Sequence, residues 1–459
     1  MASKILMDDM PELMENIVKN LNNEIYSLYS CALVSRHWCK ISIPILWQDP
    51  FSFSRRSPLF ISNYFSSLGE YEKIILKECG INEEFSKTIF DYARFLKDLD
   101  LSRLYFQVEK WIELVLDNSN SLSDNRLKHN RIIDITNLLL KLLIENGATL
   151  HSLDLFFSKC REFKPEIFYV LGQNVQFLSQ LQYLSLNEID VDDIDSATTW
   201  LRAVAKYTTK ISTLEIELFY PNYRFFTEFY GMISSLESQK NSLQEVIIDT
   251  RAFNEEFEVL KICKNLEVLR IRSCDQELSK LSKILDNKIG NKISTRDVIC
   301  SQIYAQQPIA LMLEKSGTLL QRLRLKLNGD ESQEYTLLLE ALKSFCPNII
   351  YLDIMNIKFS TQLVELISEL QKLRFLSLRC YNNDIPDEEL KKQVMQFSEI
   401  LPLTLQYLDL NTCTDRILHT KQTFKNVGVY EYIDLDDNIR KEVEAYVELV
   451  TFRRILVYC

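Results

Sequence analysis

The chain has 459 residues, more than one compact hydrophobic core usually serves, so we expect several domains or one elongated array of repeats. A hydrophobic content of 46%, with only 9 glycines and 10 prolines, excludes a largely disordered protein. The net charge of −11 disfavours general binding to nucleic acid or anionic membranes, because phosphate contacts need clustered Lys and Arg. We therefore expect protein partners, and neither nucleic acid nor a membrane.

The cysteines indicate an intracellular protein. They number 11, are scattered through a long chain, and follow no apolar signal segment after Met1. We expect reduced, mostly buried thiols and a cytoplasmic or nuclear location. The longest apolar stretch, 135–144, is interrupted by Thr136, Asn137 and Lys141, which predicts no membrane span.

Three short helices are predicted within the first fifty residues. The first begins at Pro11 and carries apolar residues three and four positions apart up to Leu21. The second runs from Leu28 to Trp38, and the third from Ile41 to Trp47. Because three short helices bury little surface by themselves, we expect a partner to cover them.

These fifty residues resemble the F-box family. The resemblance covers about residues 5 to 50 and depends on Met10-Pro11-Glu12, the segment 33–38 and the closing Pro44-Ile45-Leu46-Trp47, with Met10 where leucine is common. It implies docking onto the Skp adaptor of an SCF-type cullin-RING ubiquitin ligase. The residues that it assigns to the adaptor interface are Met10, Pro11, Ile17, Leu21, Leu33, Val34 and Trp38.

The resemblance assigns Leu46 and Trp47 to packing within the module. An alternative is that the three helices only cap the rest of the chain. Residues 51–69 then form a connector, in which prolines break the helix and aromatic residues indicate packing. Within it we expect a helix from about Leu59 to Leu68.

From residue 70 onward one pattern recurs, with aliphatic residues at its first, fourth and sixth positions. This pattern is typical of leucine-rich repeats. A degenerate copy begins at Ile293, with Arg296 at an aliphatic position. The other copies begin at Tyr71, Leu96, Leu150, Leu181, Ile211, Leu243, Leu266, Leu320, Ile349, Leu373 and Leu405.

The pattern predicts an α/β fold: a small all-helical F-box followed by a leucine-rich-repeat solenoid over 70–413, with a parallel concave sheet, convex helices and an arc shape. A helical excursion is expected over about 104–147, as helices 104–116 and 132–146, and a cap over 414–459 with a helix at 438–449 and a strand at 454–458. The other helices are expected at 163–171, 199–207, 225–236, 257–263, 278–285, 309–313, 335–345, 361–369 and 390–400.

The ninth position of a repeat is expected to hold an Asn or Cys that turns inward at the end of the strand. Cys79, Cys274, Asn328 and Cys413 occupy it. No metal, nucleotide or other cofactor is expected, because the four histidines lack ligand spacing and no CxxC, GxGxxG or GxxxxGK occurs. We therefore expect no enzymatic activity.

The third, fifth and seventh positions of each repeat should point outward, because side chains alternate along a strand. They predict an acidic patch of Thr213, Glu215, Glu217, Glu245, Ile247 and Asp249. They also predict a basic and aromatic client face, in whose columns Val268 and Arg379 lie as well. Its members are Arg270, Arg272, Arg322, Arg324, Lys326, Tyr351, Phe375 and Tyr407.

These observations lead to one hypothesis of function. The chain is expected to be a non-catalytic substrate receptor that binds the Skp adaptor, and through it the cullin and RING subunits, and holds a protein client on its repeats. For the client face, the alternative is that acidic and basic columns only neutralise each other. For the whole chain, the alternative is a leucine-rich-repeat scaffold or small-GTPase regulator outside any ligase.

Overall fold

The computed structural model describes residues 11–21, 24–52, 57–116, 125–157, 163–189, 193–218, 237–249, 259–260, 262–272, 295–303, 306–327, 335–381, 397, 400–412 and 426–427. The chain divides into two compact units, Met1–Glu215 and Ile216–Cys459. Met10, the inward positions Cys274, Asn328 and Cys413, and the helices expected at 225–236 and 278–285 lie outside the described residues. So do residues 257, 258 and 261 of the helix expected at 257–263, most of the helix expected at 390–400, and the helix and strand expected in the C-terminal cap.

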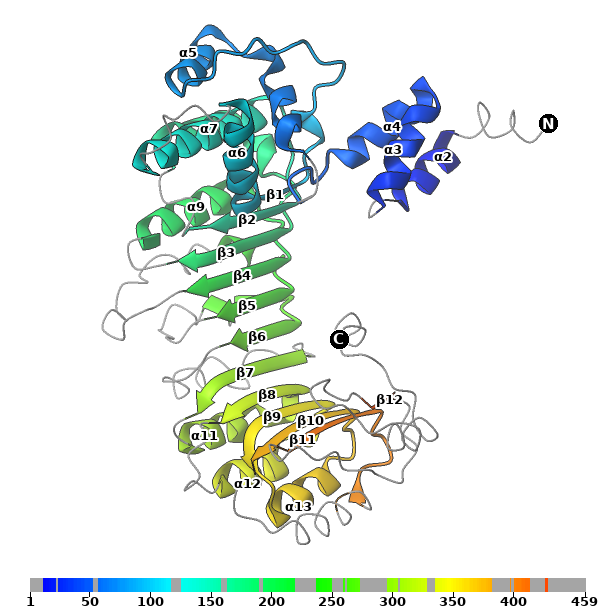
Figure 1. Ribbon diagram of the computed structural model, residues 1–459. Coiled ribbons are helices and arrows are strands. Elements are labelled where there is room, and N and C mark those ends of the chain that lie inside the picture. Colours follow the sequence, from blue (N-terminus) through cyan, green and yellow to red (C-terminus); the bar gives the residue numbers. More distant parts are fainter. Residues whose placement is uncertain are drawn as a thin grey trace, which may run out of the picture. The chain divides into compact units, whose positions relative to one another are not determined.

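The first unit begins with the three predicted helices, α2 (Pro11–Lys19), α3 (Ile25–Val34) and α4 (Arg36–Leu46) (Figure 1). Ser35 separates the last two and caps α4, since its hydroxyl accepts the N–H of Trp38 at 3.3 Å. Their small core consists of Met14, Val18, Leu28, Ile45 and Leu46.

The connector contains the 3₁₀-helix η1 (Pro58–Ser67), close to the helix expected there. The next segment corrects a prediction. The repeat expected at Tyr71 is the helix α5 (Glu70–Glu78), so no strand forms there and the first repeat begins at Leu96. Glu and Lys favour a helix, and Lys73 pairs with Glu70 one turn away at 2.8 Å.

Helix α5 ends in a Schellman motif, in which a glycine adopts the left-handed conformation. Gly80 has φ +88° and donates its N–H to the carbonyl of Lys77, while Ile81 donates to Leu76. Cys79 is therefore the residue that ends this helix: it is buried, but its predicted place at the end of a repeat strand was wrong.

The rest of the first unit alternates strands and helices. The strands β1 (Asp98–Asp100), β2 (Ser152–Phe156) and β3 (Tyr183–Ile189) pair in parallel in chain order. Strand β4 (Thr213–Leu218) begins in this unit and crosses its boundary. The helical elements are η2 (Ala93–Phe95), α6 (Leu101–Val115), α7 (Asn125–Glu145), α8 (Pro165–Gln173), η3 (Val175–Phe177) and α9 (Ile194–Tyr207).

The second unit repeats the same alternation. Its strands pair in parallel in chain order: β5 (Glu245–Asp249), β6 (Val268–Arg272), β7 (Thr295–Ile303), β8 (Arg322–Leu327), β9 (Tyr351–Lys358), β10 (Phe375–Tyr381), β11 (Tyr407–Thr412) and β12 (Asn426–Val427). The helical elements are α11 (Gln306–Ser316), η7 (Gly317–Leu319), α12 (Thr336–Phe345) and α13 (Thr361–Glu369). Strand β7 confirms the degenerate repeat at Ile293, with Arg296 in register with Leu269.

One hydrogen-bond arrangement joins successive repeats in each unit. The carbonyl at the second position of a repeat accepts the N–H groups of the second and third positions of the next repeat. Thus Gln182 accepts from Ser212 and Thr213, and Gln321 accepts from Ile350 and Tyr351. The aliphatic first, fourth and sixth positions fill the core, as at Leu373, Leu376 and Leu378, which are fully buried.

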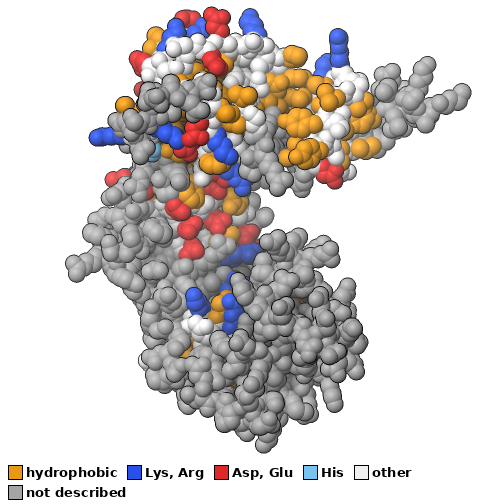
Figure 2. Space-filling model, viewed as in Figure 1, with side chains coloured by type: hydrophobic (Ala, Val, Ile, Leu, Met, Phe, Trp, Pro, Cys, Tyr) orange, Lys and Arg blue, Asp and Glu red, His pale blue; other side chains and the backbone are white. Residues whose placement is uncertain are grey.

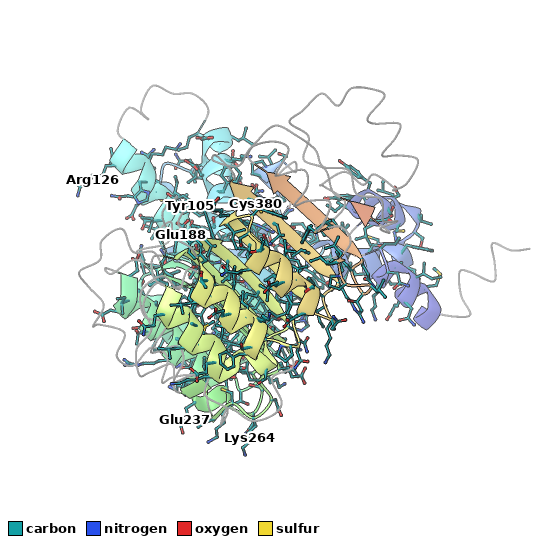
Figure 3. The ribbon with its side chains drawn as sticks, turned by 90° about the horizontal axis from the view of Figure 1, so that it is seen from below. Tyr105, Arg126, Glu188, Glu237, Lys264 and Cys380 are labelled. Carbon is teal, nitrogen blue, oxygen red and sulfur yellow. The ribbon has the colours of Figure 1, made fainter. Side chains whose placement is uncertain are left out.

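In two repeats the inward-turning residue at the end of the strand is neither Asn nor Cys. Glu188, labelled in Figure 3, and Asn356 have positive φ, at 49° and 59°. Each stands at the eighth position, and the ninth is an isoleucine, Ile189 or Ile357, that is 1% exposed. A left-handed residue thus turns an aliphatic side chain inward in these repeats.

Among the described residues, no helix has the length and apolar content needed to cross a membrane.

Candidate partner-binding surfaces

The first candidate surface lies on the N-terminal helices. Tyr26, Tyr29 and Leu33 follow one another at helical spacing along one side of α3 and are 82%, 38% and 87% exposed. Val34, at the end of α3, and Ile17 on α2 are exposed as well. These five residues are called the helical apolar patch, and Figure 2 shows hydrophobic side chains gathered over these helices.

The predicted adaptor residues divide between this patch and its surroundings. Ile17, Leu33 and Val34 belong to the patch, while Leu21 and Trp38 are half-buried. Pro11 starts α2. Tyr26 and Tyr29 were missed by sequence reasoning, although the absence of any charged residue from α3 was a signal that could have identified them.

The N-terminal helices are joined firmly to the first repeat. Trp47 follows α4, is 3% exposed, and packs against the rings of Phe60, Tyr64 and Tyr92 at centroid distances of 5.9, 5.5 and 3.9 Å. Trp47 therefore connects the helices to the connector, besides any packing within the helices themselves.

Gln48 continues this junction through its backbone. Its carbonyl accepts the N–H groups of Lys97 and Asp98 at 2.9 and 3.0 Å. This is the bond pair that the second position of a repeat provides to the next repeat. The N-terminal module thus occupies the place of a preceding repeat and caps the strand β1.

The second candidate surface is the outward side of β8 to β11. Tyr351, Phe375 and Tyr407 lie at the third position of successive repeats and are in register across β9, β10 and β11. Their ring centroids are 6.4 and 6.3 Å apart, and each residue is half-buried. These three residues are called the aromatic row.

Arginines from β8 fix the first ring of the row. The guanidinium of Arg322 lies over the ring of Tyr351, 4.6 Å from its centroid, and Arg324 donates to the Tyr351 hydroxyl at 3.1 Å. Arg324 also pairs with Asp353 on β9 at 2.8 Å. Lys326, two positions farther along β8, is exposed. Figure 2 shows basic side chains beside hydrophobic ones on this unit.

Two buried carboxylates lie next to the aromatic row, at the fifth position of their repeats. Asp353 and Asp409 are in register with Ser377 between them. Burial raises the pKa of Asp409 to about 6, against the opposing charge of Arg379. Burial also raises the pKa of Asp353, opposed by the Arg324 charge and by hydrogen bonding from Ser377.

The remaining members of the predicted client face show partial neutralisation. Arg270 pairs with Glu245 of the neighbouring strand at 2.8 Å, and the side chain of Arg272 lies outside the described residues. Ile247 was expected to be an exposed outward residue, yet it is only 8% exposed. It is in register with Arg270, which pairs with Glu245 two residues before Ile247. Ion pairs between neighbouring strands therefore neutralise part of the predicted positive charge. The aromatic row and the exposed Lys326 stay accessible to a ligand.

Acidic side chains lie on the outward side of the strands of the first unit. Burial raises the pKa of Asp154 to about 6, the charge of Asp100 adds to this shift, and the side-chain amide of Asn187, which donates to Asp154 at 2.8 Å, opposes it. Tyr183 donates to Glu215 at 2.9 Å. Of the predicted acidic patch, Glu215 lies in this group, and its carboxylate already accepts a hydrogen bond within the chain.

Two solved structures have limited similarity to this chain. The leucine-rich-repeat-containing protein LegL7 from Legionella pneumophila has 14% identity and a TM-score of 0.38 over 61% of this chain and 89% of that one. The complex of Rad7 and Elc1 from yeast has 13% identity and a TM-score of 0.37 over 76% of this chain and 86% of that one. No family model and no curated protein matches the sequence.

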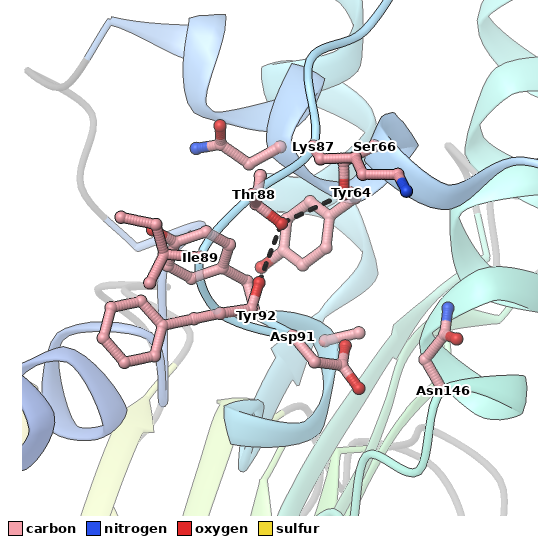
Figure 4. Close-up of a pocket in the computed structure, with 11 residues that line it drawn as sticks. Tyr64, Ser66, Lys87, Thr88, Ile89, Asp91, Tyr92 and Asn146 are labelled. Carbon is pink, nitrogen blue, oxygen red and sulfur yellow. Dashed lines mark hydrogen bonds between the residues drawn. The ribbon is translucent and has the colours of Figure 1, made fainter.

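A polar pocket of about 390 Å³ lies beside the connector (Figure 4). Tyr64, Thr88 and Tyr92 line it, and the Thr88 hydroxyl donates to the Phe90 carbonyl at 2.8 Å. Burial raises the pKa of Asp91 in its wall. The Thr88 hydroxyl is thus already hydrogen-bonded within the chain, also with Ser66 at 3.1 Å, and no group of metal-ligating side chains is found among the described residues.

The described cysteines have the character of buried structural thiols. Cys79, Cys263, Cys346 and Cys380 are buried, and Cys31 and Cys39 are half-buried. Burial raises the pKa of Cys79 and Cys263 to about 11 and that of Cys346 to about 12, so these thiols stay protonated and weakly nucleophilic at neutral pH.

Proposed function

We propose that this chain is a non-catalytic substrate receptor of an SCF-type ubiquitin ligase. Its N-terminal helices bind the Skp adaptor, which connects it to the cullin and RING subunits, and the outward side of β8 to β11 holds a protein client. Other subunits carry out ubiquitin transfer, and the receptor contributes by raising the effective concentration of the client near the charged enzyme.

The observation that carries the proposal is the helical apolar patch. Leu33 is 87% exposed and Tyr26 is 82% exposed on a helix whose only fully buried residue is Leu28. Exposing several large apolar side chains side by side is unfavourable in water, so such a patch marks an interface. Ile17, Leu33 and Val34 are among the residues that the F-box resemblance assigns to the adaptor.

The junction at Trp47 and Gln48 supports the same function. A receptor must hold its client at a defined position relative to the adaptor, and a loosely tethered F-box would spread that position over a large volume. The buried Trp47 and the paired N–H groups received by Gln48 hold the N-terminal helices against the first repeat. Rigid attachment at this end is what the mechanism requires.

The experiment is co-purification of the full chain with the Skp adaptor, comparing wild type with Leu33→Asp. Burying an uncompensated carboxylate in an interface costs several kcal/mol, so we expect adaptor affinity to fall by about 100-fold. The matched control is Leu337→Asp, which places the same charge at an exposed leucine of α12. It should leave adaptor capture unchanged.

Point substitutions are preferable to deleting residues 1–50. That deletion would remove Trp47 and the carbonyl that pairs with Lys97 and Asp98, and would thereby expose the end of the repeats. A folded wild-type chain that fails to capture the adaptor would favour a free-standing repeat scaffold or small-GTPase regulator instead.

A further inference from the structure

The spacing of the aromatic row carries an inference about the client, which rests on the proposed client-binding role of this face. The rings of Tyr351, Phe375 and Tyr407 repeat every 6.3–6.4 Å across the strands. In an extended chain, residues rise by about 3.3 Å each, so alternate side chains on one face are about 6.6 Å apart. An extended segment that crosses β9, β10 and β11 can therefore place one side chain on each ring.

The rings favour apolar side chains at those alternate positions. Each ring is half-buried, so it has a fixed orientation and still presents apolar surface to a ligand. Tyr351 is held further, by Arg322 over its ring and by Arg324 at its hydroxyl. Prearranged rings lose little conformational entropy on binding, which is why aromatic residues dominate protein-recognition sites.

The net charge of this face determines which client residues are favoured next to the apolar ones. Among the described outward residues of β8 to β11, Arg322, Arg324, Lys326 and Arg379 are cationic, whereas Asp353 and Asp409 are acidic. Four cations against two carboxylates leave a positive excess. Lys326 is exposed, so a client carboxylate at the β8 end of the row can reach an ammonium group.

The geometry points to an extended acidic peptide segment as the client motif recognised by this face. The segment has apolar side chains at three alternate positions, one for each ring of the aromatic row, and acidic residues on the side of β8. Neither the alternation nor the position of the acidic residues follows from the repeat pattern alone. Both depend on the register and on the ring distances.

The test uses three fluorescein-labelled peptides of equal length and measures their binding to the full chain by fluorescence anisotropy. The first probe is Glu-Asp-Ser-Leu-Ser-Leu-Ser-Leu. The second has the same composition with its three leucines consecutive, and the third has Lys-Lys in place of Glu-Asp. We expect the first probe to bind at least about tenfold more tightly than either of the others.

Variants assign the binding to the face. Phe375→Ala should weaken the first probe by about tenfold, and Phe375→Tyr, which keeps a ring, should restore it. Lys326→Glu should weaken the first probe and strengthen the third. Leu337→Ala, at an exposed leucine on α12, is the matched control and should leave binding unchanged. Thermal unfolding of each variant verifies that it is folded.

Equal binding of the first two probes would overturn the inference, and so would the absence of binding by all three probes. An equal effect of Phe375→Ala and Leu337→Ala would do the same. Adaptor capture by the same preparations separates this inference from the proposed function. Captured adaptor without peptide selectivity contradicts only the client motif, while selective peptide binding without adaptor capture contradicts only the ligase role.

Discussion

At the scale of single residues, the outward face of the repeats contains carboxylates whose charged form is disfavoured by burial. Asp154 in the first unit and Asp409 in the second both occupy the fifth position of a repeat, and burial raises the pKa of each to about 6. Sequence reasoning could place these residues on the outward face. Their burial and their neighbours Asn187 and Ser377 depend on register and twist, which the repeat pattern does not specify.

The raised pKa of Asp409 predicts a pH dependence of stability. The native state holds the proton more tightly than the unfolded chain, whose pKa is near 3.8, so Asp409 favours folding below pH 4 and this contribution is lost as the pH rises through about 6. Asp409→Asn should therefore raise the free energy of unfolding at pH 7.5 by about 1–3 kcal/mol, with no gain at pH 4.

Denaturant unfolding at several pH values measures this effect. The control is Glu365→Gln, which removes an exposed carboxylate of α13 that lies 3.7 Å from Lys343 and should change the free energy of unfolding by no more than about 0.5 kcal/mol. A destabilising effect of Asp409→Asn at pH 7.5 would mean that the interactions of the carboxylate with Arg379 and Ser377 outweigh its burial.

At the scale of elements, the aliphatic spacing predicted nearly all the described strands. It was right at ten full repeats from Leu96 to Leu405 and at the degenerate repeat of Ile293. The reason is that the first, fourth and sixth positions are buried in the core and are therefore occupied by aliphatic residues in nearly every repeat. It was wrong at Tyr71, where Tyr71 and Ile74 are exposed and only Leu76 is buried. The spacing of three apolar residues is compatible with a strand or a helix. The high helix propensity of the Glu and Lys residues between them favours the helix.

The end of α5 gives a prediction that distinguishes a helix from a strand. Gly80→Ala should lower the free energy of unfolding by about 1 kcal/mol, because an L-residue is strained at φ +88°. An added Cβ would lie 3.6 Å from Leu116, an ordinary contact, so backbone strain dominates. Gly172→Ala, inside α8, should instead raise it by up to about 1 kcal/mol, because alanine favours the helix, less the cost of shifting the Tyr207 hydroxyl that lies 3.2 Å from the added Cβ. Equal effects in denaturant unfolding would contradict the Schellman motif.

The junction between the N-terminal helices and the first repeat gives another prediction. Trp47→Ala removes a fully buried ring and should loosen the bonds from Lys97 and Asp98 to the Gln48 carbonyl. Hydrogen exchange at these two amides should accelerate by about 10-fold to 100-fold. The amides of Ser212 and Thr213, which make the same bonds to Gln182, are an internal reference and should keep their rates.

At the scale of the whole molecule, the chain has two surfaces of different chemistry. The helical apolar patch is hydrophobic and belongs to the first unit, while the aromatic row with its surrounding cations belongs to the second. The F-box resemblance pointed to part of the first surface and the repeat columns pointed to the second, and the ion pairs across the strands agree in part with the alternative of mutual neutralisation. A receptor needs two such surfaces that act independently, so that adaptor and client do not compete.

The most direct measurement of this account is a calorimetric titration of the Skp adaptor into the full-length chain, with wild type, Leu33→Asp and Phe375→Ala compared. We expect one-to-one binding by the wild type, a loss of affinity of about 100-fold in Leu33→Asp, and wild-type affinity in Phe375→Ala. No binding by a folded wild-type chain, or equal affinity of the wild type and Leu33→Asp, would contradict it.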